Sequence, residues 1–100
     1  MIEETISLRH SEGKGFVIPL GGINLVGVVT RNGMVGCGAF DVSALNNFAY
    51  PAAKVRPVSG PSIVTIEDLL SGEIKEANAA AQKFGITAGM TGGAALDLLS

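Results

Sequence analysis

The feature that most constrains the fold is a series of apolar segments separated by two tight-turn dipeptides. In chain order these segments and turns are 16–20, Gly21-Gly22, 23–30, Asn32-Gly33 and 34–37. Glycine and asparagine adopt the positive φ that two-residue hairpin turns require. The pattern therefore predicts three antiparallel strands joined as a β-meander. A shorter alternating segment, 5–8, predicts a further strand before them.

These strands are apolar on both of their faces. A sheet with one wet face alternates apolar and polar residues, whereas segments 16–20 and 25–29 do not. The chain's own helices can cover one face, but 100 residues leave little for a second sheet. Only 16% of the residues are charged, against about 25% in a typical soluble domain. We therefore expect the outer face to pack in a homo-oligomer, a dimer or a tetramer.

Helices are predicted after residue 40. Asp41, Thr65 and Thr91 suit the N-caps of helices over 42–49, 66–70 and 92–99. Residues 73–84 predict a fourth helix, because apolar side chains recur there at helical spacing and Gly85 suits a left-handed C-terminal cap. The proline-rich connection 51–61 has room for a short strand at 54–58.

The sequence thus predicts a single α+β domain over residues 1–100, β-rich in 1–40 and mostly helical in 41–100. The expected architecture is an antiparallel β-meander with three to four helices covering one face, and the β region forms the oligomer interface.

Charge and cysteine content exclude several classes of function. The net charge is −2 and the seven basic residues are scattered, so we expect no nucleic-acid partner. The apolar stretches are broken well before the ~20 residues of a membrane span, and the first residues lack the pattern of a signal peptide. We therefore expect a cytoplasmic protein with no membrane partner.

The single cysteine excludes an intramolecular disulfide and a paired-cysteine zinc site, so neither a metal nor a cofactor is predicted.

Cys37 and Asp41 are the candidate catalytic residues. Cys37 lies between two glycines at the end of a predicted strand, shortly before the helix that Asp41 caps. Amide dipoles at such a position favour an anion, including a thiolate. The alternative is that Cys37 is a small buried apolar residue, since the only histidine, His10, is distant in sequence.

A glycine-rich loop over 85–93 is the candidate ligand site. Gly89, Thr91, Gly92 and Gly93 enter a predicted helix, where free amides could hold a phosphate or carboxylate. The alternative is a capped turn in which glycines allow tight helix packing. No lysine follows as in a Walker loop, and the glycine spacing differs from that of dinucleotide-binding folds.

Three stretches carry a resemblance to a known family. They are Gly-Met-Val-Gly-Cys-Gly-Ala-Phe-Asp from residue 33, Thr-Ile-Glu-Asp-Leu-Leu from residue 65, and Gly-Ile-Thr-Ala-Gly-Met-Thr-Gly-Gly-Ala-Ala-Leu from residue 85. Together they resemble the YunC-like family of small bacterial and archaeal proteins, a domain of unknown function. The resemblance implies a single α+β domain whose N-terminal β region mediates oligomerisation, as a tetramer. It implies neither a reaction nor a ligand.

Two functional hypotheses follow. The first is a homo-oligomeric module that binds a small ligand or a protein partner, since no catalytic constellation is visible. The second is a small enzyme with a site at the subunit interface, in which Cys37 is a nucleophile or redox thiol. In that case Asp41 and the loop 89–93 would orient an anionic substrate.

Overall fold

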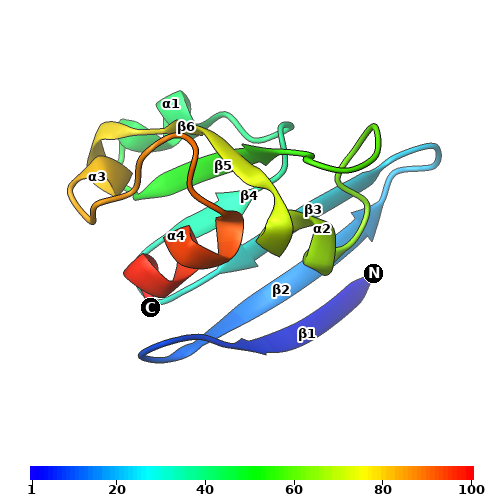
Figure 1. Ribbon diagram of the computed structural model, residues 1–100, viewed down its shortest axis with the longest axis horizontal. Coiled ribbons are helices and arrows are strands. Elements are labelled where there is room, and N and C mark those ends of the chain that lie inside the picture. The colour runs from blue at the N-terminus through cyan, green and yellow to red at the C-terminus, as the bar shows by residue number, and fades with distance from the viewer.

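The computed structural model describes residues 1–100 and contains one six-stranded sheet with four helices (Figure 1). The strands are β1 (Ile2–Ser7), β2 (Glu12–Pro19), β3 (Asn24–Val29), β4 (Met34–Gly36), β5 (Ala52–Arg56) and β6 (Glu73–Ala77). The helices are α1 (Val42–Asn46), α2 (Ile66–Ser71), α3 (Ala79–Gln82) and α4 (Gly92–Leu99). The predicted α+β class is confirmed. No helix has both the length and the apolar character needed to cross a membrane.

The strands lie in the sheet in the order in which they occur in the chain (Figure 1). All neighbouring pairs are antiparallel except β4 and β5, which are parallel and are connected through α1. The predicted meander corresponds to β2, β3 and β4. Its first turn places Gly21 at φ +100°, as the Gly-Gly dipeptide led us to expect.

The sheet carries apolar packing on both faces. On one face Val28, Val35 and Ala53 belong to the main core, beneath α2 and α4. Met34 and Ala52 alternate with these residues and therefore point the other way, where they pack against Val42 of α1. The expectation that the helices cover one face thus needs correction for α1, which covers part of the opposite face.

The prediction of one helix over residues 73–84 is wrong. Residues 73–77 form β6, antiparallel to β5, and the chain turns at Asn78 into the short helix α3. The helical spacing of apolar residues therefore did not produce a helix here. Phe84, the last apolar residue of that pattern, is 38% exposed. Gly85 does adopt the predicted left-handed conformation, at φ +92°.

Asn78 explains why the helix begins late. Its buried side-chain oxygen accepts hydrogen bonds from the amides of Ala81 (2.9 Å) and Ala52 (3.2 Å). Its side-chain nitrogen donates to the carbonyls of Val42 and Tyr50, at 2.9 Å each. One amide side chain therefore caps α3 and holds it to β5 and α1, contacts that a local sequence pattern does not reveal.

Residues 1–40 are β-rich, as expected, but residues 41–100 contain strands as well as helices. Two of the six strands, β5 and β6, lie after residue 41, and β5 begins two residues earlier than the strand predicted at 54–58. The three predicted N-caps are correct, since Asp41, Thr65 and Thr91 each accept a backbone hydrogen bond in the first turn. Helix α1 ends at Asn46, three residues earlier than expected.

The end of α4 is attached to the turn between β3 and β4. The Leu99 carbonyl accepts hydrogen bonds from the side chains of Thr30 (3.0 Å) and Asn32 (2.8 Å). The Ser100 carbonyl accepts one from Nε of Arg31, at 2.8 Å. These contacts fix α4 across the main core.

Candidate functional site

A cavity of about 440 Å³ opens at the end of the sheet where the β2–β3 turn lies. Its walls come from four separate segments, 21–24, 37–39, 55–57 and 62–64, together with Lys75. Cys37, Val55 and Ile63 are buried and form the inner wall. Because these segments are distant in sequence, only the folded chain brings them together.

Cys37 is a buried core residue that also lines the cavity. It is 6% exposed and packs within the main core, and its amide donates to the Val26 carbonyl at 3.0 Å. Cys37 also lines the cavity. His10 lies elsewhere, in a separate depression with Arg9 and Asp97, so no imidazole stands beside the thiol.

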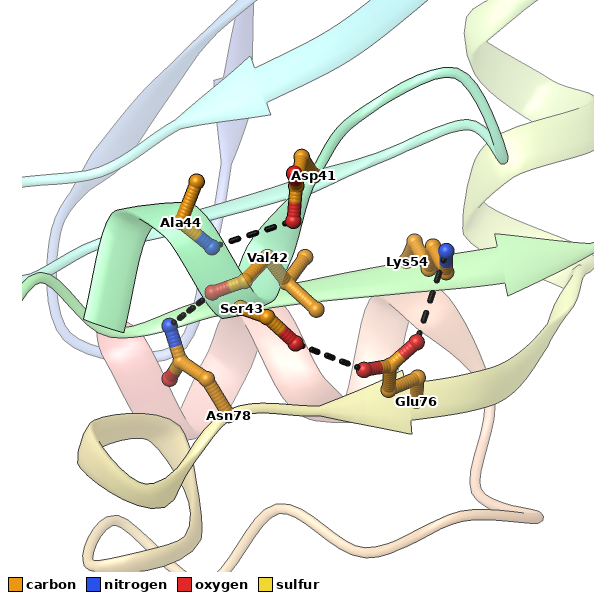
Figure 2. Close-up of polar contacts among 7 residues, drawn as sticks. All are labelled: Asp41, Val42, Ser43, Ala44, Lys54, Glu76 and Asn78. Atoms are coloured by element: carbon orange, nitrogen blue, oxygen red, sulfur yellow. Dashed lines mark hydrogen bonds and ion pairs between the residues drawn. The ribbon is translucent and has the colours of Figure 1, made fainter. Parts of the chain in front are cut away.

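Asp41 is not part of the cavity lining. Its carboxylate accepts the amide of Ala44 at 3.0 Å and so begins α1, the helix on the opposite face (Figure 2). Near it, Glu76 accepts a hydrogen bond from Ser43 at 3.2 Å and pairs with Lys54 at 3.4 Å (Figure 2). The structure therefore does not bring Asp41 to Cys37.

The glycine-rich loop is used mainly for capping and close packing. The Gly92 amide donates to the carbonyl of Gly72 (2.9 Å), and the Ala94 amide donates to the Thr91 hydroxyl (3.1 Å). A Cβ on Gly92 would lie 2.1 Å from the Leu69 carbonyl oxygen, so α2 and α4 approach each other only because this residue is glycine.

Thr91, Gly92 and Gly93 do not line the cavity. Gly89, at φ +100°, borders an adjoining groove together with Arg56, Glu73 and Lys75, and its own amide donates to the Ile74 carbonyl at 2.9 Å.

Two cations that sequence patterns did not single out, Arg56 and Lys75, line the cavity. Arg56 lies at the end of β5 and forms an ion pair with Glu73 across the two strands. Lys75 lies at an irregularity of β6 and makes no ion pair. Both also border the adjoining groove at Gly89. No aspartate or glutamate lines the cavity, so the titratable residues around it are these two cations and the thiol.

The wall formed by 62–64 is held by Asp68 of α2. The Asp68 carboxylate accepts the amides of Val64 (3.0 Å) and Thr65 (3.1 Å), and the Thr65 hydroxyl accepts the Asp68 amide in return. These backbone hydrogen bonds lower the pKa of Asp68 below its ordinary value. Across the cavity, the Asn24 side chain donates to the Val64 carbonyl at 3.1 Å. The capping box of α2 thus also fixes the cavity rim.

Chemically, this arrangement suits binding. Its inner wall is apolar, its rim carries a few hydrogen-bonding groups, and its charge is positive. No cluster of three or more histidine, cysteine, aspartate or glutamate side chains is arranged to hold a metal ion.

Comparison with known proteins gives a family and a structural neighbour. Residues 36–99 match the family described as Domain of unknown function (DUF1805). No curated protein matches the chain. The fold is similar to that in "Crystal Structure of a Protein of Unknown Function TA1206 from Thermoplasma acidophilum", with 26% identity and a TM-score of 0.85. That similarity covers 99% of this chain and 92% of that one. The chain therefore belongs to the DUF1805 family, a domain of unknown function.

Proposed function

We propose that this chain is a homo-oligomeric binding module that holds a small molecule in the cavity beside Cys37 and has no catalytic activity of its own. The observation that carries the proposal is the cavity of about 440 Å³. Small-molecule sites in proteins typically have volumes of about 300–1,000 Å³, with mostly apolar walls and a few polar groups. The cavity fits that description, and no general base accompanies the thiol.

The homo-oligomeric part of the proposal rests on the sheet face that α1 leaves open. We name the residues Phe16, Ile18 and Val29 the open strip. They share the face of Met34, and Val29 is 38% exposed. Phe48, after α1, is 80% exposed. Exposed apolar side chains on a chain with few charges favour self-association, as a dimer or a tetramer.

We also propose a closer relationship to the YunC-like proteins and a location in the cytoplasm. The motifs around Cys37 and in 85–96 support a closer relationship to the YunC-like proteins within this family. A single thiol with no partner for an intramolecular disulfide fits a reducing cytoplasm. We propose no nucleic-acid partner, because the seven basic residues form no stripe.

Small-molecule binding is tested by NMR with a fragment library and the ¹⁵N-labelled protein. We expect binders to shift the amide signals of 21–24 and 37–39. The variant Ala39→Trp fills the cavity mouth and should abolish these shifts, because Ala39 is an exposed lining residue. Ala79→Trp, on the exposed first residue of α3, is the matched control and should leave them intact. Fragments that shift only amides outside the cavity would overturn the proposal.

The second candidate function is an enzyme in which Cys37 is the nucleophile or redox thiol. The observation that favours it is that the thiol lines the cavity together with two cations. Under our main proposal, Cys37→Ala keeps the binding of fragments, and iodoacetamide labels Cys37 more slowly than a free thiol because the side chain is buried. Turnover that disappears in a folded Cys37→Ala variant would establish the enzyme instead.

A further inference from the structure

We infer that the molecule held in the cavity is a small organic anion, whose carboxylate or phosphate group is bound by Lys75 and Arg56. This inference rests on the binding function proposed above and adds the chemical class of the ligand. It follows from the charge around the cavity, from the register of β5 and β6, and from the apolar inner wall.

The charge around the cavity is opposite to that of the whole chain. The chain has a net charge of −2, yet the cavity is lined by one arginine and one lysine and by no acidic residue. Glu73 already compensates the charge of Arg56, so Lys75 carries the uncompensated positive charge at the cavity. Such a site attracts a negatively charged ligand and disfavours a cationic one.

The register between β5 and the edge strand β6 leaves Lys75 without a partner. Lys54 pairs with Glu76, and Arg56 pairs with Glu73, each as a cross-strand ion pair. Val55 lies opposite Ile74, so Lys75 is the additional residue between these pairs, at a β-bulge. A bulge redirects a side chain and occurs often next to functional sites. Here it places the one unpaired lysine of β6 on the cavity.

Arg56 keeps donors for a ligand although it is already paired. A guanidinium group carries five N–H donors in a planar fork, and the ion pair with Glu73 involves only its Nη2 atom. A carboxylate or phosphate can accept two of these donors side by side. Arg56 is exposed, so the group is accessible from the cavity mouth.

The opposite wall defines the rest of the ligand. Val55 and Ile63 are buried apolar residues of the cavity, and Cys37 lies with them. A short hydrocarbon portion suits this wall, since burying apolar surface there is favourable. The ligand class is thus a short-chain organic acid or a phosphate monoester.

Three probes of one chain length test the inference: butyl phosphate, butyrate and 1-butanol. Each is titrated into ¹⁵N-labelled protein while the amides of 21–24 and 37–39 are followed. We expect at least one anion to bind more tightly than 1-butanol, and more weakly at high salt. The preferred anion distinguishes a phosphate ligand from a carboxylate ligand.

The charge variants isolate the role of Lys75. In Lys75→Gln, an exposed substitution, the affinity for the preferred anion should fall about tenfold, as expected from loss of one charge-assisted hydrogen bond. Lys83→Gln makes the same charge change on an exposed residue outside the cavity and should leave the affinity unchanged.

The outcomes separate this inference from the proposed function. If 1-butanol binds in the cavity as tightly as both anions, or if Lys75→Gln has no effect, the anion inference is wrong while the binding function stands. If none of the three probes shifts the cavity amides, and the fragment library also fails to do so, both are wrong.

Discussion

Gly92 of α4 lies so close to Leu69 of α2 that a Cβ atom on Gly92 would be 2.1 Å from the Leu69 carbonyl oxygen. Leu69 is fully buried in the main core, and the backbone around it cannot move without disturbing that core. The contact between these two residues therefore sets the distance between the two helices that cover the sheet.

The first prediction concerns this contact. Gly92→Ala should lower the free energy of unfolding by about 3 kcal/mol, because a methyl group would have to push α2 away from α4. Urea denaturation measures the change. Gly93→Ala is the control on the same helix, since its Cβ would lie 3.4 Å from the nearest atom, and it should be neutral or slightly stabilising. An equal loss of stability in both variants would show that the contact between Gly92 and Leu69 is not the cause.

The second prediction concerns Asn78. Asn78→Ala should lower the free energy of unfolding by about 3 kcal/mol, because buried backbone groups of three elements would lose their partners. Thermal or urea denaturation measures the loss, with Asn47→Ala as control, since Asn47 is exposed. A variant as stable as the wild type would show that water replaces the amide at little cost.

The third prediction concerns acid stability. Backbone hydrogen bonds from Val64 and Thr65 hold the pKa of Asp68 below its ordinary value of 3.8. The carboxylate therefore stabilises the folded state at pH values well above 3.8. This contribution disappears as the pH falls through the lower, folded-state pKa. Asp68→Asn should be less stable at neutral pH, with a difference from the wild type that shrinks in acid.

Urea midpoints measured across the acid range test this expectation. Glu67→Gln is the matched control in the same helical turn, where the side chain accepts no backbone hydrogen bond. NMR titration of the Asp68 carboxyl carbon gives its pKa directly, and an ordinary value would refute the argument. Loosening of the rim at Val64 should also weaken fragment binding in Asp68→Asn.

The fourth prediction concerns the open strip. Val29→Lys should shift the protein toward monomers, because a charged side chain is costly to bury in an apolar contact. Sedimentation velocity measures the assembly state. Val58→Lys adds the same charge at an exposed position outside the open strip and should leave the assembly unchanged. A wild-type protein that is monomeric at all concentrations would contradict self-association through the open strip.

Local sequence patterns predicted the parts of the fold that depend on local chemistry. The meander was predicted from Gly21-Gly22 and Asn32-Gly33, and of these four residues only Gly21 adopts the expected positive φ. The helix starts follow from capping residues such as Thr65 and Thr91. The prediction failed at residues 73–77, where pairing with β5 overrides a helical spacing of apolar residues. Such pairing is a long-range property.

The same difference between local and long-range contacts explains which cavity residues could be predicted from the sequence. Cys37 could be selected from the sequence because it is the only cysteine and lies between glycines. Lys75 could not, because its position on the cavity depends on a register shift between two strands. Arg56 and Asn24 likewise reach the cavity from segments whose proximity only the completed sheet establishes.

The strand order also has a consequence for folding kinetics. Since β1 to β4 pair as consecutive hairpins, their contacts have short sequence separation, which favours rapid formation of this part of the sheet. Helix α4 instead makes long-range contacts, since the last carbonyls of the chain accept hydrogen bonds from the side chains of Thr30, Arg31 and Asn32. Closing a loop of this length costs more chain entropy than closing a hairpin. We therefore expect the sheet to form first, and the docking of α4 to complete the core.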